Sequence, residues 1–137
     1  MKANELMIGD KVMVRVLSQI PNTYVLHTWT ANDYSRDIQV KPIPLTTEIL
    51  EKNGFYDRNT QWYYKRFGSY VCFDIAISLV YREIEVSKVC GAGTDCEEEE
   101  YGSSIVFGND IYVHELQHVL RLCGLDELAD NFKVYEK

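Results

Sequence analysis

The sequence has little that would direct it to or across a membrane. Residues 1–6 contain no apolar segment typical of a secretory signal, and no apolar run approaches the length that spans a bilayer. We therefore expect a cytoplasmic protein with no membrane partner. Of its 137 residues 46% are hydrophobic and 12% aromatic, which is enough for one domain or for two small lobes that share a core.

Positive charge is also scarce. The chain has 14 Lys and Arg against 21 Asp and Glu, a formal net charge of −7, and no cluster of basic residues. Nucleic-acid-binding proteins gain much of their affinity by neutralising phosphates, so this composition argues against a nucleic-acid partner. An acidic chain instead suits a protein partner with a basic surface.

The four cysteines form no C-x-x-C pair. In a reducing cytoplasm we expect free thiols, with Cys72 and Cys123 as small core residues. Cys90 and Cys96 flank a Gly-containing segment, 91–95, and three states stay open for them. They could be two free loop thiols, which the compartment favours, or a disulfide, or part of a zinc knuckle.

Near the N-terminus, three short segments have the alternating and β-branched composition of strands. They are residues 11–17, 23–30 and 37–40. Pro42 and Pro44 then stop further strand pairing. We predict a small β unit over residues 1–45, with a partly open, SH3-like barrel as its specific form.

Residues 46–137 are predicted to form an α+β lobe, with a core that the β unit could share. Thr46 caps a short helix that Gly54 ends. An antiparallel meander follows, with strands at residues 61–66, 70–81, 82–89 and 104–107. Residues 56–60 and the acidic segment 91–103 are predicted to be loops. The expected fold class is therefore α+β, closed by an amphipathic helix that packs on the sheet.

That closing helix is predicted over residues 110–124, with Asp110 as the N-cap and Gly124 in the left-handed position that ends it. Stepping about 100° per residue divides it into two faces. The apolar face carries Ile111, Tyr112, Leu116, Val119, Leu120 and Cys123. The opposite face, which we expect to be exposed to solvent, carries His114, Gln117, His118 and Arg121.

Residues 114–118 read HELQH and match the H-E-x-x-H pattern of zinc hydrolases. Histidines four residues apart on a helix can both reach one zinc ion, and the intervening Glu115 could act as general base on a zinc-bound water. A catalytic zinc normally takes three protein ligands, however. The only other histidine is His27, and the remaining candidates are the tail carboxylates Asp126, Glu127, Asp130 and Glu136. An exposed polar face that spells the motif by chance is the structural alternative.

Three segments carry a resemblance that extends over most of the chain. The opening MKANELMIGD, the middle segment from Pro42 through EILEKNGF, and YVHELQ at 112–117 resemble a group of small proteins from Bacteroidetes phages, prophages and mobile elements. Members of this group often carry Asn at the position of His118. The resemblance implies a protein made inside a bacterial host cell, and it implies no activity, because none is assigned to the group.

Two functional hypotheses follow. The first is a non-enzymatic accessory or protein-interaction protein of a phage or mobile element, with no cofactor and an unidentified protein partner; Trp62, Tyr63 and Tyr64 are candidate contact residues. The second is a small zinc-dependent hydrolase, with zinc bound by His114 and His118 and with Glu115 as the catalytic residue.

Overall fold

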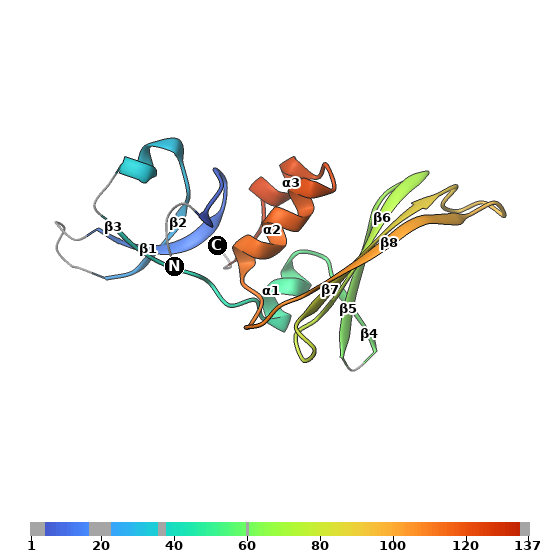
Figure 1. Ribbon diagram of the computed structural model, residues 1–137, viewed down its shortest axis with the longest axis horizontal. Helices are drawn as coiled ribbons and strands as arrows, with labels where there is room; N and C mark the ends of the chain where they lie inside the picture. The colour runs from blue at the N-terminus through green and yellow to red at the C-terminus, as the bar shows by residue number, and fades with distance from the viewer. Residues whose placement is uncertain (1–4, 17–22, 36–37, 60, 135–137) are drawn as a thin grey trace. The chain divides into compact units, whose positions relative to one another are not determined.

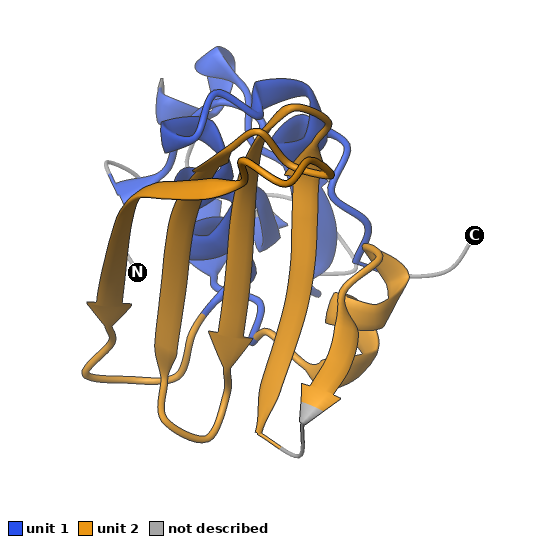
Figure 2. Cartoon of the chain, turned by 90° about the vertical axis from the view of Figure 1, so that its right-hand side faces the viewer, with its two compact units in different colours: residues 1–44, 112–137 blue, residues 45–111 orange. Residues whose placement is uncertain are grey.

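The computed structural model describes residues 5–16, 23–35, 38–59 and 61–134. It confirms the α+β fold class. The chain divides into two compact units: unit 1 comprises residues 1–44 and 112–137, and unit 2 comprises residues 45–111 (Figure 2). The closing helix is thus grouped with the N-terminal strands, whereas the sequence pattern suggested a division at residue 45. No helix in the described ranges is both long and apolar enough to cross a membrane.

Unit 1 contains a three-stranded antiparallel sheet and two α-helices (Figure 1). Its strands run in the order β2-β1-β3, with bounds Lys11–Val16 for β1, Val25–Thr28 for β2 and Ile38–Lys41 for β3. A 3₁₀ helix, η2 (Ala31–Ser35), precedes β3, and the helices α2 (Val113–Leu122) and α3 (Asp126–Asp130) complete the unit. The three expected strands are therefore present. Leu17 and Asp37, at their predicted ends, lie outside the described residues, and the SH3-like form stays a prediction.

The core of unit 1 draws on both of its chain segments. Leu6, Val12, Val14 and Trp29 form one buried cluster in the N-terminal segment. The C-terminal segment contributes Val113, Leu116, Leu120, Ala129, Phe132 and Val134, all of them buried. Burial of apolar area is the main favourable term in folding, so the unit depends on residues from both ends of the sequence.

Unit 2 is a five-stranded antiparallel meander with one short helix. The helix α1 (Thr47–Lys52) begins after Thr46, whose side chain accepts from the Ile49 N–H, and Gly54 (φ +87°) follows its end. The strands, in the order β4-β5-β6-β7-β8, are Tyr56–Asn59, Trp62–Gly68, Val71–Ser78, Glu83–Cys90 and Glu98–Val106. The sequence prediction of a capped helix followed by a meander is confirmed.

One face of this sheet is lined by large buried apolar side chains. Ile75 and Ile77 on β6 pair with Val86 and Ile84 on β7, and all four are buried. The α1 residues cover this face: Tyr63 contacts Glu51, and Lys65 donates to the Asn53 carbonyl. Successive side chains of a strand point to opposite faces, so Cys72, Ser78 and Val89, which are also buried, lie on the other face.

Two predicted loops are strands instead. Residues 56–59 pair with β5 as β4, where the Tyr56 ring packs on Tyr64 at 5.4 Å between centroids. The acidic segment also belongs to a strand from Glu98 onward, because Lys88 on β7 forms a 3.0 Å ion pair with Glu100. Cross-strand contacts thus outweigh the low β propensity of glutamate.

Candidate functional site

The helix α2 begins later than the sequence suggested. Asp110 was predicted as its N-cap, but Tyr112 holds that position and the helix runs over Val113–Leu122. The Glu115 carboxylate accepts from the Tyr112 backbone N–H at 2.9 Å, which satisfies one of the unpaired donors of the first turn. Asp110 is exposed and lies 3.6 Å from Arg82 instead.

The end of the helix agrees with the prediction. Gly124 has φ +76°, and the N–H groups of Gly124 and Leu125 donate to the carbonyls of Arg121 and Leu120. These two bonds complete a Schellman motif.

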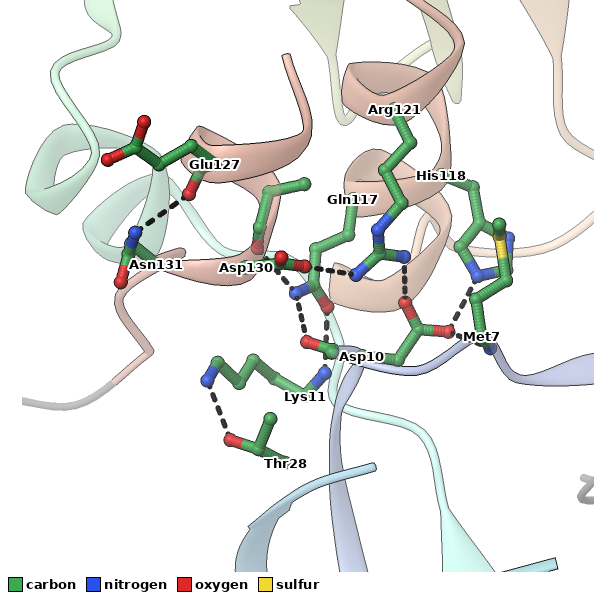
Figure 3. Close-up of polar contacts among 12 residues, drawn as sticks. Met7, Asp10, Lys11, Thr28, Gln117, His118, Arg121, Glu127, Asp130 and Asn131 are labelled. Atoms are coloured by element: carbon green, nitrogen blue, oxygen red, sulfur yellow. Dashed lines mark hydrogen bonds and ion pairs between the residues drawn. The ribbon is translucent and has the colours of Figure 1, made fainter. Parts of the chain in front are cut away.

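A buried aspartate from the N-terminal segment forms the centre of a polar network with α2 (Figure 3). Asp10 is 0% exposed, and its Oδ2 lies 2.6 Å from Nε2 of His118 and accepts from the Met7 N–H at 2.8 Å. Its Oδ1 accepts from Nη1 of Arg121, which also donates to Asp130 on α3. A buried carboxylate is costly unless it is paired and hydrogen-bonded, and Asp10 is both.

The charge of Asp10 is held in place by these contacts. Burial by itself raises the pKa of this carboxyl, but the hydrogen bonds from His118, Arg121 and the Met7 N–H outweigh it, so its pKa lies below the ordinary value. Asp10 is therefore ionised at neutral pH. Asp10 links the residues before β1 to α2, and Arg121 extends the network to Asp130 on α3.

Gln117 makes a second set of buried contacts between the same segments. Its side chain is fully buried, and Oε1 accepts from the Lys11 N–H at 2.8 Å. Its Nε2 donates to the carbonyls of Gly9 at 3.0 Å and Ala129 at 2.8 Å. The amide thus satisfies three backbone groups from two segments of the chain, residues 9–11 and Ala129, as buried polar groups require.

His114 is buried as well, with 6% of its surface exposed. Its ring stacks on Tyr112 (6.1 Å between centroids, 10° between planes) and lies 5.6 Å from the His118 ring. Within the described part of the chain, its Nδ1 is buried without a hydrogen-bond partner. Burial lowers the pKa of this imidazole, so it is neutral at pH 7.

The polar face of α2 is more buried than the sequence analysis predicted. His114 and Gln117 were predicted to face solvent and are buried, while the side chains of His118 and Arg121 are 27% and 11% exposed. The prediction was wrong because it took polar character as a sign of exposure. The polar face of α2 packs against the N-terminal segment, whose carboxylate and backbone groups pair with it.

Two of the three residues proposed for zinc chemistry, Glu115 and His118, have other hydrogen-bond partners in this structure. The Glu115 carboxylate accepts a hydrogen bond from the Tyr112 N–H, and burial raises the pKa of this carboxyl. Nε2 of His118 is hydrogen-bonded to Asp10. Across the described ranges, no three His, Cys, Asp or Glu side chains are grouped to hold a metal ion. Of the proposed third ligands, Asp130 contacts Arg121, and Glu136 lies outside those ranges.

The sequence pattern did not single out Asp10, which contributes most to this network. It lies in a Gly-Asp pair that resembled an ordinary turn. The one feature of the sequence that could have drawn attention to Asp10 is the glycine before it. In the structure Gly9 has φ +95°, which only glycine adopts readily, and a Cβ there would lie 2.4 Å from Oδ1 of Asp130.

The three candidate aromatic residues and all cysteines except Cys123 lie in unit 2. The Trp62 ring is 6.3 Å from that of Tyr81, Tyr64 contacts Tyr56, and Tyr63 reaches Glu51; all three candidate aromatics are half-buried. All four cysteines are free thiols. Cys72 is buried as expected, Cys123 is half-buried, and Cys90 donates to Glu100.

A second candidate site is the outer edge of unit 2. The strand β8 ends the sheet, and all nine of its residues are exposed. The Phe107 N–H donates to the Arg82 carbonyl. Because bonded and non-bonded pairs alternate in an antiparallel ladder, Ile105 and Ser103 also direct their backbone groups to β7. The backbone N–H and C=O groups of Gly102, Ser104 and Val106 therefore point away from the sheet.

Comparisons with known proteins give no relative from which a role could be transferred: no family model matches the chain, and neither a curated protein nor a solved structure is significantly similar to it.

Proposed function

We propose that this is a non-enzymatic protein-interaction protein, and that it binds its partner by adding an extended segment to the outer edge of β8. The observation that carries the proposal is the row of outward backbone groups at Gly102, Ser104 and Val106 on an exposed edge strand. Such a row is a template for another strand, and main-chain hydrogen bonds supply the affinity in this mode of recognition.

The side chains along β8 leave room for an added strand. Gly102 has no side chain, and a glycine within a strand often marks a position where another backbone approaches closely. Apolar side chains lie at the other end of the strand, where Ile105 is 38% and Val106 is 72% exposed. Natural edges are often blocked by charged side chains or proline; β8 contains no proline, and its charged residues are confined to positions 98–100.

The resemblance of the sequence to proteins of Bacteroidetes phages and mobile elements gives this proposal a setting. We assign the protein to the cytoplasm of the bacterial host cell, as an accessory protein of such an element that acts by binding another protein.

Two proline substitutions test the mode of binding. Ser104→Pro removes an outward N–H and leaves the β7–β8 ladder intact, whereas Ser103→Pro removes a bond of that ladder and destabilises the sheet. Ser104→Ala controls for the Ser104 hydroxyl, which donates to Glu83 at 2.7 Å.

The measurement is selection from a displayed library of random ten-residue peptides. We expect peptides that bind the wild-type protein and Ser104→Ala but not Ser104→Pro, with the fold of Ser104→Pro checked by circular dichroism. Equal enrichment on wild type and a folded Ser104→Pro variant would contradict strand addition, and so would no enrichment on wild type.

The second candidate function is the zinc-dependent hydrolase, with zinc held by His114 and His118 and with Glu115 as base. The observation that favours it is the buried Nδ1 of His114, which has no hydrogen-bond partner among the residues that the structure describes. Elemental analysis of untagged protein, purified without chelators beside His118→Asn, separates the candidates. One zinc per chain that is lost in the variant supports the hydrolase. Less than a tenth of that amount, unchanged in the variant, supports the interaction protein.

A further inference from the structure

We propose that the partner segment is basic at one end and apolar at the other, with its Lys or Arg residues beside residues 98–102 of β8. This inference rests on the proposed strand addition and names the chemistry of its partner. It follows from the distribution of charge along the edge, which is not uniform.

The acidic end of β8 has carboxylates that the protein itself leaves unneutralised. Glu100 pairs with Lys88 at 3.0 Å, and Glu97 pairs with Arg66 at 2.8 Å. Over the ranges that the structure describes, neither Glu98 nor Glu99 forms an ion pair, and both are exposed. Two negative charges are therefore available at this end for a partner.

One of these carboxylates lies beside an outward backbone position. A Cβ on Gly102 would come within 2.6 Å of Oε1 of Glu99, so this oxygen lies over the bare backbone of Gly102. A strand added at this edge would place a side chain next to the same point. A Lys or Arg there would form an ion pair and cover the acid, whereas a Glu or Asp would meet a like charge.

The other end of β8 has no acid of its own, and the acids nearest to it, Glu83 and Glu85, belong to β7. Ser103, Ser104, Ile105 and Val106 follow Gly102, with the Tyr101 ring 47% exposed between the two ends. Cross-strand pairs of apolar and β-branched side chains stabilise a sheet at such positions. The acids of β8 itself are thus confined to one end of the strand, and a shift of the partner by a few residues would move its cations from these acids to Ile105 and Val106.

The same charges disfavour a second copy of this chain as the occupant. Each chain carries a net charge of −7, and two copies repel each other most strongly at low ionic strength. A basic segment is attracted under the same conditions, so its binding should weaken as salt is added.

The test uses the peptides selected from the random library on wild-type protein. We expect an excess of Lys and Arg confined to one end of the aligned sequences. The peptide with the strongest enrichment is then titrated by fluorescence anisotropy against wild type, the double variant Glu98→Gln/Glu99→Gln, and the matched control Glu48→Gln/Asp126→Gln, which removes two exposed acids elsewhere.

We expect binding to weaken roughly tenfold in the Glu98/Glu99 variant, the combined size of two exposed ion pairs, and to stay unchanged in the control. Added salt should weaken binding to wild type more than to the variant. Neutral or acidic peptides that discriminate against Ser104→Pro would overturn the inference and leave strand addition standing. Loss of discrimination against Ser104→Pro would overturn strand addition itself. A dimer in analytical ultracentrifugation that Ser104→Pro abolishes would identify a second copy as the occupant and overturn the basic partner.

Discussion

At the scale of single residues, the arrangement of unit 1 depends on a backbone conformation beside Asp10. Gly9 has φ +95°, its N–H donates to the Trp29 carbonyl, and its own carbonyl accepts from Gln117. The chain can approach α2 and α3 this closely because the position has no side chain. Any Cβ would meet the Arg121–Asp130 pair.

Gly9→Ala is expected to destabilise unit 1 by at least about 2 kcal/mol, since the left-handed conformation costs about 1–2 kcal/mol and the contact with Asp130 adds to it. Gly124→Ala is the matched control: it has a similar φ of +76° but nothing within 4 Å of its Cβ. The measurement is urea unfolding followed by fluorescence in a Trp62→Phe background, where the buried Trp29 is the single tryptophan. Equal losses in the two variants would contradict the close contact at Gly9.

Because His114 is buried, we expect the free energy of unfolding to depend on pH. Burial lowers its pKa in the folded state, whereas in the unfolded chain the value is about 6.5. Between these two values the unfolded state binds more protons, so stability is lost as the pH falls below about 6.5, by up to about 1.4 kcal/mol per pH unit. Asp10, His118 and Glu5 are the charged groups that act on it.

The test compares the wild-type protein with His114→Phe, which keeps a ring against Tyr112 and cannot be protonated. We expect the unfolding free energy of wild type to fall relative to His114→Phe as the pH goes from 7 to 5. Parallel curves for the two proteins would show that His114 does not titrate between the folded and unfolded states.

At the scale of elements, α2 is buried on the face that its sequence marks as polar. Gln117 carries this packing through three hydrogen bonds to Lys11, Gly9 and Ala129. Gln117→Ala should cost about 2–4 kcal/mol, because it leaves buried backbone groups without partners. Leu122→Ala on the same helix should change stability by less than about 0.5 kcal/mol, since Leu122 is 84% exposed. Urea unfolding monitored through Trp29 measures both, and a small loss for Gln117→Ala would argue against the packing described.

The sequence predicts the helices and strands better than it predicts which distant residues pack against them. The capped helix at Thr46 and the glycine at position 124 were recognisable, because capping and left-handed turns depend on nearby residues. The partners of His118 and Gln117 were not, because Asp10 and Gly9 are more than a hundred residues away in the chain. The strand β8 was missed in part because its glutamates are stabilised by a neighbouring strand rather than by propensity.

At the scale of the whole molecule, unit 2 is an insertion within unit 1. The Leu45 N–H donates to the Ile111 carbonyl at 2.9 Å, so the two ends of unit 2 adjoin. The Val113 N–H likewise donates to the Ile43 carbonyl at 2.8 Å within unit 1. Adjacent ends are typical of domains that tolerate insertion and excision.

We therefore expect residues 45–111 to fold as an isolated fragment. Its sheet and α1 carry their own buried residues, among them Leu50, Phe55, Ile75 and Ile77. Trp62, its only tryptophan, reports on unfolding, and its urea transition should match that of unit 2 in a Trp29→Phe variant of the whole chain. A fragment without cooperative unfolding would show that unit 2 depends on the rest of the chain.

Because unit 1 consists of two separate chain segments, it is synthesised in two stages. Residues 45–111 are synthesised between the two segments of unit 1, after its strands and before α2 and α3. The first strands therefore wait for Gln117, His118 and Arg121, which contact Gly9 and Asp10, until all of unit 2 has been made. Throughout that interval Asp10 lacks the His118 and Arg121 contacts that hold its carboxylate, and unit 1 stays incomplete.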